Sequence, residues 1–217
     1  MKIAICISGV SYDDGSKYRY RNYEDAVNSF NENVIDYLTK QGHDVFTFLY
    51  TYQTIKSSDI LEAYNNFTEA KFIDEHNQYI PQEQTTQAIN LIGSLDMVKD
   101  LDFDFVLRAR FDQKFLTNPF TTYSWDFDKV NFLWREPEHH SLPLVNDTFF
   151  GWPHKWTNDI IDSIIDCELN PYNGVKIAIH NLNQPILGRI GKANIKILDD
   201  IFVTREMNTL YELTRHA

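Results

Sequence analysis

The stretch Phe-Asp-Phe-Val-Leu-Arg-Ala-Arg-Phe-Asp, residues 103–112, decides the fold. It is a run of apolar and aromatic residues typical of a strand, and it ends in two arginines and a carboxylate. In an open α/β sheet, ligands bind beyond the carboxyl ends of the strands, so we expect Arg108, Arg110 and Asp112 to meet the ligand there. Their alternation predicts that they project to the same side of the strand.

These three side chains favour a ligand that carries phosphate. Guanidinium groups fork onto phosphate oxygens and a carboxylate can hold a divalent metal, so the set suits a nucleoside diphosphate better than a neutral substrate. The alternative is that the arginines form ion pairs with acidic residues of the chain. Asp104, which has the same parity as Arg108 and Arg110, is one candidate for such a pair.

The residues before this stretch alternate between strand and helix patterns. Residues 2–10 form a continuous apolar run ending in Ser8 and Gly9, as a strand buried on both faces does before a ligand loop. The further predictions are strands at 44–52 and 70–74 and helices at 26–38, 57–64 and 81–99.

After residue 119 the pattern becomes mixed. It predicts strands at 130–134, 148–152 and 195–203, helices at 158–167 and 172–181, and a loop at 139–143. The chain as a whole is predicted to be one three-layer α/β/α domain with a mixed sheet, residues 1–217. Within it, residues 1–115 would form the nucleotide-binding half and residues 116–217 the acceptor half.

Composition narrows the class of partner. The 217 residues, 43% of them hydrophobic, can bury the core of one domain. A net charge of −11 argues against a general binder of nucleic acid or of anionic membranes. The sequence shows no run that predicts a membrane span or signal peptide, and its two cysteines lack metal-ligand spacing, so we expect a cytoplasmic protein.

Several of these elements together resemble a known family. The Ser-Gly strand end, the Arg-x-Arg-x-Asp strand end, Val-Asn-Asp-Thr-Phe-Phe at 145–150 and Phe-Val-Thr-Arg at 202–205 are similar to small glycosyltransferases of the GT-A fold. The resemblance is to the polysaccharide-synthesis type of bacteria and large algal viruses. It implies a nucleotide-sugar donor, a glycan acceptor, and Mn²⁺ or Mg²⁺ held by an Asp-x-Asp motif after the fourth strand.

The chain departs from that motif at one position. Arg110 stands where the first Asp is expected, so one metal ligand is missing. Either Asp112 holds the ion with help from elsewhere, such as His180, or arginine partly replaces the metal as neutraliser of the leaving diphosphate.

Further site residues follow from the ends of the predicted strands. Ser8 and Gly9 would let backbone amides approach the nucleotide, Arg21 in the following loop would reach a phosphate, and Asp74 would lie near the nucleotide. Asp147 is the candidate for catalytic base or acceptor-orienting carboxylate. Simple turn or packing roles are the alternatives. Lesser candidates for base, phosphate, acceptor or metal contacts are Tyr12, Tyr18, Tyr20, Tyr23, Glu75, Glu136, Glu138, His139, His140, Arg189 and Arg205.

These features together predict a metal-assisted glycosyltransferase. The alternative is a non-catalytic carbohydrate- or protein-binding module on the same fold. A nucleotidyltransferase fits less well, because no glycine-rich basic loop follows the first strand.

Overall fold

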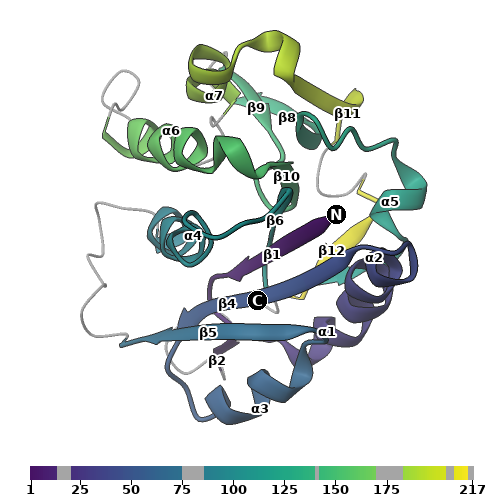
Figure 1. The fold of residues 1–217 in the computed structure, drawn as a ribbon, viewed down its shortest axis with the longest axis vertical. Coiled ribbons are helices and arrows are strands. Elements are labelled where there is room, and N and C mark those ends of the chain that lie inside the picture. Colours follow the sequence, from purple (N-terminus) through teal and green to yellow (C-terminus); the bar gives the residue numbers. More distant parts are fainter. Residues whose placement is uncertain (14–20, 75–85, 140–141, 170–182, 204–207, 215–217) are drawn as a thin grey trace.

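The computed structural model describes residues 1–13, 21–74, 86–139, 142–169, 183–203 and 208–214. Its main strands are β1 (Lys2–Ser8), β4 (Asp44–Tyr52), β5 (Phe67–Ile73), β6 (Phe105–Ala109), β8 (Val130–His139), β9 (Leu142–Val145), β10 (Phe150–Pro153) and β11 (Ile195–Phe202). Within this part of the chain they form one eight-stranded sheet in the order β11-β8-β10-β6-β1-β4-β5, with β9 paired to β8 (Figure 1). The sheet is mixed, as predicted.

The parallel half of the sheet centres on β1. This strand pairs in parallel with β4 on one side and with β6 on the other, and β5 extends the parallel run beyond β4. Residues 3–8 of β1 are all buried, which explains its continuous apolar sequence. Next to β6, β10 runs antiparallel and separates β6 from β8. The direction of the sheet therefore changes directly beside the strand that carries Arg108.

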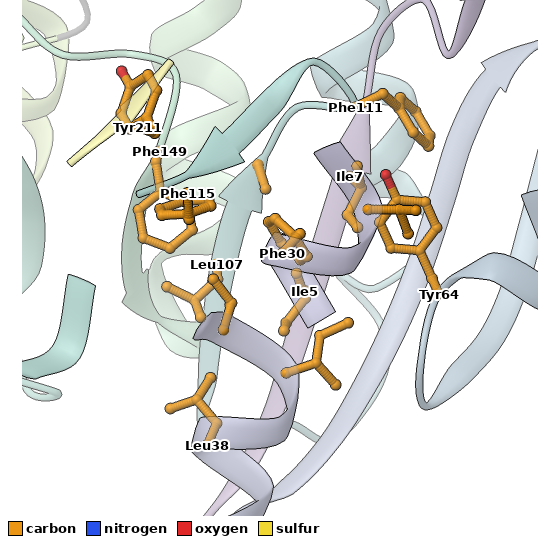
Figure 2. Packing of buried hydrophobic residues seen from close by; sticks show 14 of the residues in the cluster. Ile5, Ile7, Phe30, Leu38, Tyr64, Leu107, Phe111, Phe115, Phe149 and Tyr211 are labelled. Carbon is orange, nitrogen blue, oxygen red and sulfur yellow. The ribbon is translucent and has the colours of Figure 1, made fainter. Parts of the chain in front are cut away.

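One face of the sheet is covered by helices from the first half of the chain. α1 (Glu24–Phe30), the π-helical η1 (Asn31–Ile35) and α2 (Asp36–Lys40) follow one another without a break, and α3 (Ser57–Ala63) lies beside β5. Phe30 and Leu38 pack with Ile5 and Leu107 of the central strands (Figure 2). The predicted helices at 26–38 and 57–64 are both confirmed.

The other face is covered by α4 (Thr86–Asp96), α6 (Thr157–Leu169) and α7 (Asn183–Ile190) (Figure 1). Leu91 and Ile160 pack there with Val106 and Phe150 of the sheet. Helices on both faces of one sheet make the three-layer α/β/α architecture that the sequence predicts.

Several short elements complete the fold. They are β2 (Tyr12–Asp13) paired with β3 (Arg21–Asn22), β7 (Gln113–Phe115) paired with β12 (Tyr211–Leu213), α5 (Pro119–Thr122), and the short helical turns η3 (His154–Trp156) and η5 (Lys192–Asn194). The β7–β12 ribbon brings the end of the described chain next to the segment that follows β6. None of these elements, nor α7, was predicted.

Three predicted boundaries need correction. The strand at 103–112 is shorter, because the amide of Arg110 donates to Oε1 of Gln113 at 2.9 Å and leaves the sheet ladder. The predicted loop at 139–143 is a hairpin instead, since β8 continues to His139 and β9 begins at Leu142. The strand at 70–74 begins earlier, at Phe67. The predicted helix at 172–181 lies outside the described residues.

Candidate active site

Strand β6 holds Arg108 between two neighbouring strands. Arg108 lies opposite Cys6 of β1 and opposite Phe150 of β10 in the sheet register. Only 1% of the residue is exposed. A charged side chain is thus held in the interior, at the carboxyl end of the central strands.

The guanidinium group of Arg108 is not satisfied by the described part of the chain. Its Nε and Nη1 atoms are buried and find no hydrogen-bond acceptor there. Burial lowers the pKa of Arg108 to about 10, the charge of Asp147 opposes this shift, and Arg110 adds to it. The group is still protonated at neutral pH, so it keeps a positive charge inside the protein.

Arg110 is in the opposite situation, because it is fully paired. Its Nε donates to Oδ1 of Asp112 at 2.8 Å and its Nη2 to Oδ2 at 2.9 Å, a two-pronged ion pair. The two side chains are 16% and 4% exposed. Burial alone would lower the pKa of Arg110, but attraction and hydrogen bonding from Asp112 outweigh it, so the pKa is raised. Pairing with the chain's own acids, the alternative from the sequence, holds for Arg110, whereas among the described residues Arg108 is attracted by the charges of Asp147 and Asp112 without a hydrogen bond from its Nε or Nη1.

Arg21 joins this ion pair from the β2–β3 hairpin. Its Nε lies 3.8 Å from Oδ2 of Asp112, and its side chain is 19% exposed. Arg21 and Arg110 therefore flank one carboxylate from two sides. The structure thus brings together four of the predicted site residues, namely Arg21, Arg108, Arg110 and Asp112.

Asp147 lies in the loop between β9 and β10 and is fully buried. Its negative charge acts on both Arg108 and Arg110. The loop is anchored directly before Asp147, because the amide of Asn146 donates to the Trp134 carbonyl at 3.1 Å and the Nδ2 of Asn146 donates to the Tyr211 hydroxyl at 2.9 Å. Asp147 is therefore positioned against the two arginines.

Tyr211 is a site residue that the sequence analysis missed. Besides Asn146, its hydroxyl hydrogen-bonds the hydroxyl of Thr148, and its ring stacks on Trp134. Figure 2 shows Tyr211 above Phe115 and Phe149, with its hydroxyl turned away from both rings. Its hydroxyl also lies close enough to Arg108 and Arg110 to favour the charged forms of both guanidinium groups. No local motif marks Tyr211, because its role arises from the pairing of β12 with β7.

Ser8 and Gly9 end β1 at the same edge of the sheet. The Oγ of Ser8 is buried and meets no hydrogen-bond partner within the described residues. Gly9 adopts a φ of 122°, a conformation that favours glycine, and its amide donates to the Tyr50 carbonyl at 3.2 Å. The predicted approach of a ligand to backbone amides here is therefore not available from the Gly9 amide.

Other candidates lie elsewhere. Asp74 is exposed at the end of β5, and two strands, β1 and β4, separate β5 from β6. Arg189 pairs with Asp162 and Asp166 of α6, as the surface alternative predicts. Asp104 accepts from the amide of Lys2 at the opposite end of the strands and does not neutralise the arginines.

The remaining candidates fall into three groups. Tyr23 is buried beside α1 and packs in the core, and Tyr12 lies in β2. For Glu136, Glu138 and His139 the structure describes the backbone, which lies in β8. Outside the described residues are His180, Tyr18, Tyr20, Glu75, His140 and Arg205.

The described residues do not fit a divalent metal site of the kind the resemblance implies. Both oxygens of Asp112 accept hydrogen bonds from Arg110. No cluster of three or more His, Cys, Asp or Glu side chains suited to a metal occurs in the described ranges. His180, the second predicted ligand, lies outside them.

Comparison with known proteins identifies the fold. No protein-family model matches the chain, and no curated protein is similar to it in sequence. Among solved structures, a nucleoside-diphosphate-sugar pyrophosphorylase from Vibrio cholerae RC9 is similar with a TM-score of 0.52 and 12% identity, covering 94% of this chain and 93% of that one. The likeness shows that this chain shares the overall α/β/α fold of that protein.

Two further structures are similar over most of the chain. A β1,4-galactosyltransferase 7 mutant from Drosophila, in complex with manganese, UDP-Gal and xylobiose, has a TM-score of 0.48 and 10% identity, covering 99% of this chain and 71% of that one. A 4-diphosphocytidyl-2C-methyl-D-erythritol synthase from Anaerococcus prevotii has a TM-score of 0.48 and 12% identity, covering 95% of this chain and 93% of that one.

No helix in the described chain combines the length and apolarity needed to cross a membrane.

Proposed function

We propose that this chain is a glycosyltransferase that moves a sugar from a nucleoside-diphosphate sugar to a hydroxyl group of a glycan or another acceptor. The observation that supports the proposal most is the buried Arg108 at the carboxyl end of β6, whose Nε and Nη1 donors find no acceptor in the described protein. Ligands of open α/β sheets bind at this edge. A similar fold serves a nucleoside-diphosphate-sugar pyrophosphorylase.

The reaction explains why cations are needed here. The acceptor oxygen attacks the anomeric carbon, the bond from that carbon to the diphosphate breaks, and its electron pair leaves with the nucleoside diphosphate. Negative charge therefore grows on the leaving group, and fixed cations in a site with little water stabilise that charge strongly. Arg108, Arg110 and Arg21 are the proposed cations.

The acceptor hydroxyl must also lose a proton. Asp147 is the proposed carboxylate for this step, as base or as a group that orients the acceptor. Its burial against Arg108 and Arg110 also suits a second role, in which it keeps both guanidinium groups charged and oriented. Replacing Asp147 with Asn separates the roles, because loss of a base lowers turnover while nucleotide affinity is kept, whereas loss of a positioning group lowers both.

Thermal unfolding with a panel of UDP, GDP, CDP and ADP tests the proposal. At a concentration of ~100 Kd, a ligand adds about 2.7 kcal/mol to stability, which raises the Tm of a chain of this size by roughly 5–10 °C. We expect one diphosphate to give such a shift while its nucleoside gives none. The corresponding nucleotide sugar should then be hydrolysed slowly, or transferred when a hydroxyl acceptor is added. Absence of a shift with every diphosphate contradicts the proposal.

The pyrophosphorylase likeness favours a second candidate, a nucleotidyltransferase that makes the activated sugar. That enzyme would release pyrophosphate from a nucleoside triphosphate and a sugar 1-phosphate, which a glycosyltransferase does not do. A third pattern, glycan binding with no nucleotide binding, would indicate a non-catalytic module.

A further inference from the structure

Asp112 occupies the position where a metal ligand is expected, yet the protein itself already binds this carboxylate. Arg110 bonds both of its oxygens, and Arg21 lies 3.8 Å from Oδ2. Arg110 occupies one acceptor site on each of these oxygens and Arg21 adds a second nearby positive charge, so a divalent cation bound to Asp112 would be repelled by two guanidinium groups. Asp112 is therefore suited to hold arginines in place rather than a metal ion.

Arg108 has the complementary property. Buried polar groups in native proteins almost always have hydrogen-bond partners, so an exception calls for a physical explanation. Here Nε and Nη1 of Arg108 meet no acceptor in the described chain, although the side chain is enclosed by the sheet. An anionic ligand at this edge would supply the missing acceptors.

Three guanidinium groups gather at this edge. Among the residues described there, Arg21, Arg108 and Arg110 are positive, Asp112 and Asp147 are negative, and Asp13 lies opposite Arg21 in the β2–β3 hairpin. Arg110 and Arg21 are partly exposed, so an anion can contact them, whereas Arg108 is buried. These arginines can donate to a leaving diphosphate and so supply the stabilisation that a divalent cation would otherwise contribute.

Resting on the proposed function, we infer that the nucleoside diphosphate is bound and neutralised by these arginines, with Arg108 as the donor reserved for it, and that no divalent cation joins it to Asp112. Binding should then persist when divalent ions are removed. Because a metal bound to the nucleotide reduces its charge, adding Mn²⁺ should leave the affinity equal or weaken it.

Calorimetric titration tests the inference with whichever diphosphate of the panel gives the largest thermal shift. The titration is run once with EDTA and once with Mn²⁺. Affinity in EDTA equal to or higher than that in Mn²⁺ supports the inference. A loss of about tenfold or more in EDTA overturns it and leaves the proposed function intact. Absence of binding in both conditions rejects the proposed function, and the inference with it.

Variants test which arginine binds the diphosphate. Hydrogen bonds to charged groups contribute about 1.5–3 kcal/mol, so Arg108→Met should weaken binding in EDTA by roughly tenfold to a hundredfold. Arg21→Met should also weaken binding, by less, because Arg110 still holds Asp112. Arg189→Met removes a partly exposed arginine that pairs with α6 and should leave the affinity unchanged.

Folding of each variant is checked by its far-UV circular dichroism and its melting temperature. If Arg108→Met does not fold, Arg21→Met carries the test, since its side chain lies nearer the surface. Parental affinity in a folded Arg108→Met protein contradicts the role given to Arg108. Equal weakening by Arg189→Met would show a general charge effect and would also contradict it.

Discussion

At the amino ends of β1 and β6, charged side chains are exposed and satisfy one another, whereas at the carboxyl ends of the same strands they are buried. Lys2 bonds Asp102 at 2.7 Å, with side chains 49% and 93% exposed. At the other end, Asp112 is 4% exposed and Arg108 is 1% exposed. Exposed ion pairs contribute little to stability, while buried charges are costly unless they are fully bonded. Burial of charge at one end of the strands is therefore the reason why we propose that end as the functional one.

The largest effect is expected where a buried pair is broken. Asp112→Asn leaves the buried guanidinium of Arg110 without its counter-ion, and such a change costs about 3–5 kcal/mol. We expect the free energy of unfolding, measured with urea, to fall by about this amount. A loss below ~1 kcal/mol is typical of an exposed ion pair. It would contradict the contrast between buried charges at the carboxyl ends and exposed charges at the amino ends.

Arg108 should behave in the opposite way to Arg110. Because burial lowers its pKa to about 10, the folded protein holds the charged form at a cost. Arg108→Met should therefore leave the free energy of unfolding unchanged or raise it by roughly 1–3 kcal/mol. The charge of Asp147 would still be compensated by Arg110 in this variant. A large loss of stability would show that Arg108 is a structural residue.

The pH dependence gives an independent check on Arg108. Its pKa is lower in the folded than in the unfolded chain, so the unfolded chain binds more protons above pH 10 or so. As pH rises through about 10, the free energy of unfolding of the parent protein should therefore increase relative to that of Arg108→Met. Urea unfolding of both proteins between neutral pH and this range measures the difference, and a constant difference would contradict the assigned shift.

Tyr211→Phe should have a smaller effect, because it removes hydrogen bonds to Asn146 and Thr148 but keeps the ring stacked on Trp134. Leaving these buried polar groups without a partner costs about 1–2 kcal/mol. We also expect turnover to fall, since the Asp147 loop loses an anchor. Parental turnover with reduced stability would limit Tyr211 to a structural role.

The smallest effect is expected at the amino ends. Lys2→Met removes an exposed ion pair with Asp102, and we expect no measurable change in melting temperature or in nucleotide binding. A clear loss of either property would remove the distinction between the two ends.

The fold could be predicted from the sequence largely because its central strands are buried on both faces. Continuous apolar runs such as residues 44–52 predict β4 with its observed bounds, and helical spacing over residues 26–38 predicts most of the helical segment from Glu24 to Lys40. The short β7 and β12 have no such signal, because their stability comes from pairing with each other.

The candidate site was predictable only in part, because its contacts depend on tertiary pairing that leaves no local pattern in the sequence. Strand-end arginines draw attention through their charge, but sequence parity does not show that Arg110 pairs with Asp112 while Arg108 stays unsatisfied. Nor does any local pattern place Tyr211 against Asn146, since tertiary pairing alone makes that contact.

The contact between Tyr211 and the loop before β10 also bears on synthesis. Tyr211 stands 65 residues after Asn146, so a nascent chain that has already emerged from the ribosome through Arg108 and Asp147 still lacks the side chain that anchors their loop. The sheet can form around β1 and β6 well before that moment. A chain cut short before Tyr211 should then form these central strands while the Asp147 loop still lacks the anchor that Tyr211 supplies.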